Sequence, residues 1–276
     1  MADTKALRNR IKSVDSTLHL TKAMGLVASS KLRRANDAML KGRQYSAAVR
    51  DVIARLTESR ECQKSAYMRT SDGDYHTRRR IIVIAGDRGL AGGYNANIFR
   101  LAAQYDGAQF IPIGKRACDR YRPGTYDPKL DSSEHYSLKE AAALARQLCA
   151  DFIDGAYDRL GIISTRYISM LSQEAVIEWL LPLTRGDKAV SHTGSIIFEP
   201  DEVSILNAVV PEYIAGILVG AVRESFASEV AARRCAMDSA GKNAEEMIEN
   251  LQLEYNRARQ GAITQEITEI VAGSGS

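Results

Sequence analysis

An unbroken seven-residue repeat of apolar and small side chains runs from Leu7 to Leu56. No proline interrupts it, and Asp3 or Thr4 can cap its start. The repeat predicts one helix from about residue 4 to 57, roughly 80 Å long at 1.5 Å per residue. No compact domain of this size needs such a helix, so we expect it to lie against a second long helix. The seam consists of Leu7, Ile11, Val14, Leu18, Thr21, Gly25, Ala28, Leu32, Ala35, Met39, Gly42, Ser46, Val49, Ile53 and Leu56.

The other end of the chain supplies the partner helix. After Glu199-Pro200-Asp201 the sequence turns helical, and Pro211 marks either a second helix start or a kink. No further proline occurs up to Val271, which predicts a helix roughly 90 Å long. We therefore expect the two ends of the chain to pair as a long antiparallel coiled coil. The C-terminal seam consists of Ala244, Ile248, Leu251, Tyr255, Ala258 and Ala262.

Small residues occur on both long helices. Gly25 and Gly42 each cost about 1 kcal/mol of helix propensity relative to alanine. We interpret them as sites of close helix packing, and a tolerated weak point is the alternative. The small residues of the C-terminal helix are Ala227, Ala231, Ala232, Ala236, Ala240, Gly241 and Ala244.

The central part of the chain follows a different pattern, because short apolar runs alternate with amphipathic ones. This alternation predicts a small Rossmann-like α/β domain with a largely parallel sheet, inserted between the two long helices. The predicted domains are an N-terminal coiled-coil helix (1–58), a linker or loop (59–80), the α/β domain (81–200) and a C-terminal coiled-coil helix (201–276). Strands are expected at 81–85, 109–113, 160–164, 168–179 and 196–198, the third and fourth as a hairpin or a meander. Helices are expected at 95–105, about 115–121 and 138–154, with a loop at 122–136.

Composition and motifs exclude several classes of function. The chain is 45% hydrophobic and 26% charged, begins without an apolar leader, and holds no apolar run near the ~20 residues of a membrane span. Its four cysteines lie far apart, which argues against a zinc site or a disulfide framework and favours reduced thiols in the cytosol. The four histidines are scattered, and no nucleophile elbow or distinctive carboxylate pair occurs. We therefore predict no catalytic residue, no cofactor site and no metal site in this chain.

A glycine-rich segment, Gly86 to Gly93, follows a predicted strand and precedes a predicted helix. A phosphate-binding loop occupies this position in many α/β proteins. The segment nevertheless lacks both the G-x-G-x-x-G spacing and the Gly-Lys-Ser/Thr of a P-loop. We interpret the glycines as a tight strand-to-helix turn, and nucleotide binding is the alternative.

A basic stretch on the N-terminal helix contains Lys22, Lys31, Arg33 and Arg34. Aromatic residues that could stack on bases are absent there, and the net charge of the whole chain is only +3. We therefore expect an acidic protein surface as the partner in preference to nucleic acid. A solvated helix face is the alternative interpretation.

The last helical turns are apolar on more than one side, at Ile263, Ile267, Ile270 and Val271. A helix end that outruns its partner helix should be polar all round. The apolar end therefore predicts a protein sleeve around it, and a helix end docked on the same chain is the alternative.

Three segments of this sequence resemble the γ subunit family of rotary ATP synthases. The similarity spans nearly the whole chain and is of the bacterial type. The segments are Leu253 to Val271 with Tyr255-Asn256-Arg257-Ala258-Arg259-Gln260, the N-terminal run with Arg10-Ile11-Lys12-Ser13-Val14 and Thr21-Lys22-Ala23-Met24, and Asp87-Arg88-Gly89-Leu90-Ala91-Gly92-Gly93-Tyr94-Asn95.

The resemblance implies a central-stalk rotor subunit of an F-type ATP synthase. Such a subunit transmits torque between a membrane-embedded c ring and a catalytic head of α and β subunits, and so couples ion flow to ATP synthesis or hydrolysis. The ε subunit is a further implied partner, and ATP, ADP and Mg are expected on the α and β subunits. The implied location is peripheral, on the cytoplasmic face of the bacterial plasma membrane, with no membrane span and no nucleic acid partner.

The resemblance also assigns partner contacts to individual residues. It places Arg259, Gln260 and Thr264 against a loop of the β subunits, Lys22 and Met24 beneath an acidic lever of the β subunit, and Glu199 at the foot facing the c ring. The predicted partner interface is Lys22, Met24, Lys31, Arg33, Glu199, Arg259, Gln260, Ile263, Thr264 and Ile267. The alternative function is a soluble nucleotide-binding regulatory α/β protein with a coiled-coil dimerisation arm.

Overall fold

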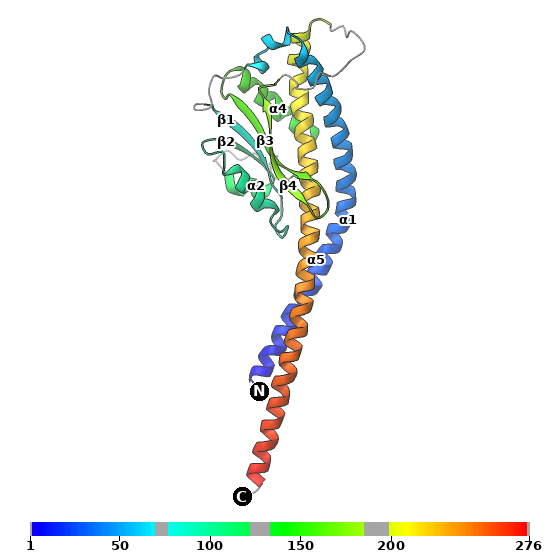
Figure 1. The fold of residues 1–276 in the computed structure, drawn as a ribbon, viewed down its shortest axis with the longest axis vertical. Coiled ribbons are helices and arrows are strands. Elements are labelled where there is room, and N and C mark those ends of the chain that lie inside the picture. Colours follow the sequence, from blue (N-terminus) through cyan, green and yellow to red (C-terminus); the bar gives the residue numbers. More distant parts are fainter. Residues whose placement is uncertain (1, 70–76, 122–132, 185–198, 275–276) are drawn as a thin grey trace. The chain divides into compact units, whose positions relative to one another are not determined.

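A computed structural model describes residues 2–69, 77–121, 133–184 and 199–274. The chain forms two compact units, one of residues 1–30 with 233–276 and the other of residues 31–232. Both units contain parts of the two long helices, α1 (Ala2–Glu58) and α5 (Glu202–Ser274) (Figure 1). The two long helices predicted from the terminal repeats are confirmed.

In the first unit the two helices pair through the predicted seams. Every seam position of α1 and α5 in this unit is buried or partly buried. A Cβ atom built on Gly25 lies 3.7 Å from Cβ of Met237, and one built on Gly241 lies 3.7 Å from Oγ1 of Thr21. The residue numbers run in opposite directions along the two helices, so the predicted antiparallel pairing is confirmed. The buried residues of this pairing include Leu18, Thr21 and Ala28 on α1 with Met237, Ala244 and Leu251 on α5.

Pro211 lies inside α5, which is continuous from Glu202 to Ser274. The prediction of a second helix start at Pro211 is therefore wrong. A proline removes one helical hydrogen bond and crowds the preceding turn. Its neighbours Val210 and Tyr213 are buried in the hydrophobic core, and packing of this face outweighs the local cost.

Close packing does not explain Gly25. The 3.7 Å separation from Met237 is an ordinary van der Waals contact, so an alanine fits there, and this glycine is a tolerated weak point. Gly42 does lie where two backbones meet, because its Cβ would be 3.6 Å from Cα of Gly220. The tightest helix contacts belong to α5, where a Cβ on Gly216 would lie 2.5 Å from the ring of Tyr45.

The second unit is built on a four-stranded sheet in the order β2-β1-β3-β4. Strand β1 (Arg79–Ile84) is parallel to β2 (Gln109–Ile113) and to β3 (Arg159–Tyr167). Strand β4 (Gln173–Leu181) returns antiparallel to β3 as a hairpin. The inserted, largely parallel α/β sheet is confirmed. The strand expected at 196–198 and most of the loop expected at 122–136 lie outside the described residues.

The predicted start of the fourth strand was five residues early. Residues 168–172 form the hairpin turn, in which the Ile168 and Ser169 amides both donate to the carbonyl of Ser172. Apolar side chains at Ile168 and Leu171 made this turn look like a strand, yet they are 58% and 82% exposed. The turn geometry outweighs the strand propensity of its residues.

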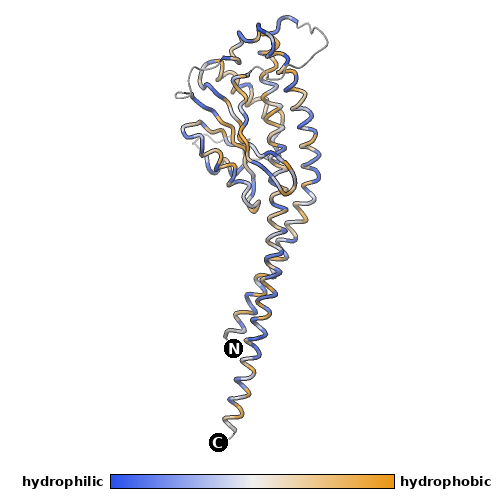
Figure 2. Tube along the Cα trace, viewed as in Figure 1, coloured by the Kyte–Doolittle hydropathy of each residue, from blue (hydrophilic) through white to orange (hydrophobic). Residues whose placement is uncertain are grey.

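Each face of the sheet is covered by a separate layer. Ile82 and Ile84 of β1 join a cluster with α4 (Leu138–Ile153) and the N-terminal part of α5, while Ile81 and Val83 pack with α2 (Tyr94–Ala102). Ser137 caps α4 in a complete capping box with Glu140. The short helix α3 (Lys115–Tyr121) follows β2. Alternation along β1 therefore places one core on each side of the sheet, and hydrophobic stretches within the sheet can be followed in Figure 2.

Residues 59–69 pack against other parts of the second unit, to which they belong. They contain two short 3₁₀ helices, η1 (Cys62–Lys64) and η2 (Ala66–Met68), with Cys62 and Tyr67 buried. The Ser65 hydroxyl donates to the side-chain oxygen of Asn207 on α5 at 2.8 Å. Part of the segment predicted as a linker at 59–80 therefore contributes to the core.

One described helix, α5, is long and apolar enough to cross a membrane by length and composition alone. Its most apolar window is 56% buried inside the protein. The buried residues between Leu206 and Val222 belong to the core cluster on one face of the sheet. Packing in this core accounts for the apolar composition of the helix.

We expect Gly25→Ala to raise the free energy of unfolding by up to about 1 kcal/mol, because alanine favours the helix and fits the space. Urea unfolding followed by circular dichroism measures the change. Gly114→Ala is the contrasting variant, since Gly114 has a φ of +89° and an added Cβ would lie 2.0 Å from the carbonyl oxygen of Ala85. A loss of stability in Gly25→Ala would contradict the assignment of this site as a weak point.

The four cysteines are free thiols, and Cys62, Cys118 and Cys149 are buried while Cys235 is partly exposed. Burial raises the pKa of Cys149 to about 11. We expect one thiol of the folded chain to react rapidly with Ellman's reagent at pH 8, and four to react after unfolding. Cys235→Ser should remove the rapid reaction, whereas a rapid reaction that persists in this variant would contradict the prediction.

Candidate functional site

The C-terminal end of α5 lies uncovered among the described residues of its own unit. Ala262 is the last partly buried seam residue, and every residue from Ile263 to Gly273 is exposed. The apolar side chains there are well exposed, at 43% for Ile263, 56% for Ile267 and 65% for Ile270. Exposed apolar area of this kind marks an interaction surface. The alternative of an end docked on the same chain finds no support among the described residues.

Polar side chains of this end bond within the helix. The Thr264 hydroxyl donates to the carbonyl of Gln260 at 2.9 Å, and the Thr268 hydroxyl donates to the carbonyl of Thr264 at 2.8 Å. The Gln265 amide donates to the Glu269 carboxylate at 3.0 Å. These groups are satisfied locally, so the end offers apolar surface with few unused donors. Arg259 and Gln260 lie exposed at its base.

The basic stretch of α1 is partly neutralised by the chain itself. Lys22 pairs with Glu245 of α5 at 2.7 Å in the first unit, and Lys31 pairs with Glu134 at 2.6 Å in the second. Met24 is half-buried, and Arg33 is exposed with no ion pair in the described part of the chain. Lys22 and Met24 thus belong to the first unit, and Lys31 and Arg33 to the second. Both lysines form ion pairs within the chain.

Glu199 is exposed in the turn that precedes α5. Asp201 caps the helix, because its carboxylate accepts the backbone N–H of Ser204 at 2.8 Å and also the Ser204 hydroxyl. These hydrogen bonds lower the pKa of Asp201. Ser59 donates to the Glu202 carboxylate, so the start of α5 is tied to the end of α1 within the second unit. Glu199 therefore lies two residues before a capped helix start.

The glycine-rich segment between β1 and α2 is filled by side chains of this chain. The Gly86 amide donates to Oδ1 of Asn95 at 2.9 Å, and the Asp87 carboxylate accepts the amides of Ser133 and Glu134. Glu229 of α5 lies so close that a Cβ on Gly86 would be 2.7 Å from its carboxyl carbon. Two carboxylates at this turn oppose a phosphate group, so the tight-turn interpretation is the better one.

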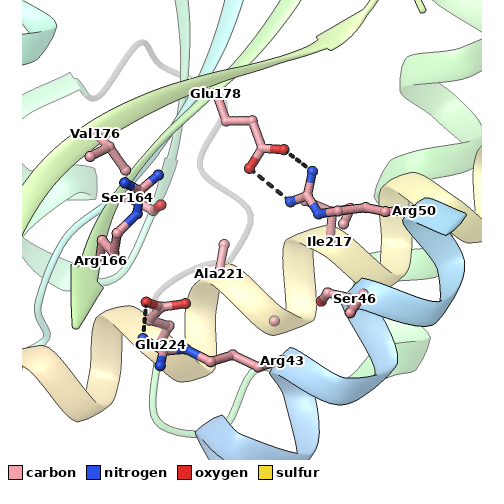
Figure 3. Close-up of a pocket in the computed structure, with 12 residues that line it drawn as sticks. Arg43, Ser46, Arg50, Ser164, Arg166, Val176, Glu178, Ile217, Ala221 and Glu224 are labelled. Carbon is pink, nitrogen blue, oxygen red and sulfur yellow. Dashed lines mark hydrogen bonds and ion pairs between the residues drawn. The ribbon is translucent and has the colours of Figure 1, made fainter. Parts of the chain in front are cut away.

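A cavity of about 250 Å³ lies between α1, α5 and the β3–β4 hairpin (Figure 3). Arg50 of α1 pairs through two hydrogen bonds with Glu178 of β4. Arg43 of α1 donates to Glu224 of α5 at 2.7 Å and to the carbonyl of Tyr167 at 2.6 Å. The two arginines therefore connect α1 to the sheet across the cavity.

Within the described residues, no group of three metal-ligating side chains comes together. Sequence reasoning missed two features of the second unit, namely the buried Glu229 and the paired arginines of α1. A signal existed for Glu229, since it is a lone acidic residue in the small, apolar run Ala227 to Ala232. The arginine pairs had no such signal, because their partners lie far away in the sequence.

Comparisons with known proteins decide the family. A family model described as ATP synthase matches residues 3–276. The ATP synthase gamma chain of Moorella thermoacetica is 37% identical over 293 residues, covering 99% of each chain. The gamma chain of Ruminococcus albus is 38% identical over 285 residues, covering 99% of this chain and 98% of the relative. The chain belongs to the ATP synthase gamma chain family. As a gamma subunit it is a non-catalytic rotor component of the central stalk.

Solved structures share the fold at lower sequence identity. A chain of the Euglena gracilis mitochondrial ATP synthase (OSCP/F1/c-ring, rotational state 3) aligns with a TM-score of 0.66 and 19% identity, covering 98% of this chain and 93% of that chain. A chain of the Tetrahymena thermophila mitochondrial ATP synthase (central stalk/c-ring) aligns with a TM-score of 0.61 and 22% identity, covering 80% of this chain and 99% of that chain. These likenesses confirm the fold of long terminal helices with an inserted α/β sheet.

Proposed function

We propose that this gamma subunit carries torque between a membrane c ring and a catalytic head of α and β subunits. The single observation that supports this role most is the uncovered apolar end of α5, from Ile263 to Val271. Four large apolar side chains exposed together on one helix end exceed the scattered single apolar residues that are normal on a protein surface. Their exposure fits a segment that turns inside a sleeve formed by other subunits.

The proposed bearing works by apolar contact. Apolar packing is non-directional, so it holds a helix without fixing one orientation. Ion pairs and hydrogen bonds prefer one geometry and would resist rotation. The internal hydrogen bonds of Thr264, Gln265 and Thr268 keep polar groups of the end from binding the sleeve. Arg259, Gln260 and Thr264 face a loop of the β subunits in this proposal.

Lys22 and Met24 of the first unit lie in the proposed contact with an acidic lever of the β subunits, and Lys31 and Arg33 of the second unit are further proposed partner contacts. Lys22 and Lys31 already hold carboxylates of this chain, so an incoming acidic group must compete with Glu245 and Glu134. Exchange between internal and external carboxylates lets the contact form and break, because exposed ion pairs are worth only about 0–1 kcal/mol. Arg33, which is exposed, supplies the charge that needs no such exchange.

Glu199 marks the proposed foot that faces the c ring, and the ε subunit binds near this end of the α/β domain. In this proposal the chain is a peripheral subunit on the cytoplasmic face of the bacterial plasma membrane. Support for this foot comes from the cap at Asp201 and from the Ser59–Glu202 contact, which fix the helix start that follows Glu199. A fixed helix start is what a contact under load requires.

The first test is assembly. We expect the full chain to co-purify with α and β subunits and to support ATP hydrolysis in that complex. A chain shortened to remove residues 253–276 should bind more weakly and support less hydrolysis, because it lacks the apolar end. Failure of the full chain to co-purify would contradict the proposal.

The second test addresses the bearing. We expect Ile263→Lys with Ile267→Lys to reduce torque and ATP hydrolysis of the assembled complex, since two charges would be placed in an apolar sleeve. Ile263→Leu with Ile267→Leu is the matched control, which changes the same two positions and keeps their apolar character. If the lysine variant hydrolysed ATP and turned like the unmodified complex, the apolar-bearing idea would fail.

A further inference from the structure

The order of the strands creates a topological switch point at the carboxyl ends of β1 and β3, a position called the sheet crevice below. The chain leaves β1 for β2 on one side and then crosses to β3 on the other, so the carboxyl ends of β1 and β3 lie at the point where the direction of winding changes. In open α/β sheets this switch point is where ligands bind. In this chain the crevice is occupied by α5.

One polar face of α5 fills the crevice. Glu224, Ser225, Ser228 and Glu229 are spaced so that they share a face of the helix. Three of them bind the backbone at the end of β3. The Thr165 amide donates to the Ser225 hydroxyl at 3.0 Å, the Tyr167 amide donates to Glu224 at 2.9 Å, and the Ser228 hydroxyl lies 3.5 Å from the carbonyl of Thr165.

The same face binds the segment that follows β1. The Tyr94 hydroxyl donates to the carbonyl of Ser225 at 3.0 Å, and the Arg88 amide lies 3.4 Å from Oε1 of Glu229. Gly86 lies against the Glu229 carboxylate, where no larger residue fits without displacement. Glu229 itself is only 2% exposed. The carboxylate thus meets the backbone at the position where a bound ligand would meet it.

A buried carboxylate is costly unless its surroundings compensate for its lost hydration. Apolar packing alone would hold α5 against the sheet at lower cost, and the clusters on both faces already provide it. Apolar packing, however, allows a helix to turn or slide by small steps, whereas hydrogen bonds fix direction and distance. The polar face therefore contributes a defined rotational setting of α5.

We propose that Glu229, supported by Ser225, is a positioning residue that fixes the rotational setting of α5 in the sheet crevice. This inference rests on the proposed torque-carrying function. Torque that enters through the α/β domain passes to α5 only if the helix cannot turn within that domain. Directional contacts at the crevice prevent this turning, and the adjacent Gly86 is required because it lets the carboxylate approach the backbone.

The test uses the complete membrane-bound ATP synthase with Glu229→Ala in the gamma chain. We expect ATP-driven ion uptake per ATP hydrolysed to fall at matched assembly, while hydrolysis itself continues. Hydrogen exchange should become about fivefold faster at the Arg88 amide, the size expected when its one net hydrogen bond to Glu229 is lost. Exchange at Thr165 should also become faster, because α5 is then free to turn away from β3. Glu229→Gln, which keeps the shape and the acceptor oxygen, should restore both measurements toward the unmodified enzyme.

Glu246→Gln is the control, because Glu246 is an exposed residue of the same helix. It should change neither measurement. If Glu229→Ala gives too little folded protein, Ser225→Ala carries the test, since it removes only the acceptor of the Thr165 amide. Normal ion uptake per ATP in either assembled variant would overturn the inference. Failure of the unmodified chain to assemble with α and β subunits would instead count against the proposed function.

Discussion

The burial of an apolar seam is the interaction on which the remainder of this structure depends. A long helix in water gains little from its own hydrogen bonds, because propensity alone makes isolated helices marginal. Each of the two terminal helices supplies the surface that the other must cover. In the first unit this exchange is nearly all that holds the chain together, and the seam there is narrow, with Thr21, Ala28 and Ala244 among its buried residues. In the second unit the same helices also gain a sheet to pack against.

Periodicity made the long helices predictable, since a seam that repeats from Leu7 to Leu56 has only one simple explanation. The strands were predictable where they are buried on both faces, as in β1. Prediction failed at the turn of residues 168–172, because exposed Ile168 and Leu171 look like strand residues when their surroundings are unknown. At Pro211 one of the two alternatives, the second helix start, was wrong, because a core contact outweighs a local rule.

The candidate site also has features that the sequence predicts and features that it does not. The apolar end of α5 was visible in the sequence because apolar residues on several sides of a helix end break the expected pattern. The contacts of the basic stretch were not visible, since the pairing of Lys31 with Glu134 joins residues 103 positions apart. Predicting the position of Glu229 at the sheet crevice requires the order of the strands, and no local sequence pattern contains that order. The chemical character of a segment can be predicted from its sequence, whereas the residues that it contacts depend on the topology of the fold.

The helix in the sheet crevice has a consequence for how such a domain behaves in a cell. A diffusible ligand leaves its site whenever its concentration falls, but a segment of the same chain is always present at a high effective concentration. Contacts that are individually worth about 1 kcal/mol can then hold at any dilution of the protein. A phosphate-bearing metabolite would have to displace α5 from the sheet crevice, and the carboxylate of Glu229 would repel its phosphate. A position that binds small molecules in other open α/β sheets is therefore closed to them in this domain.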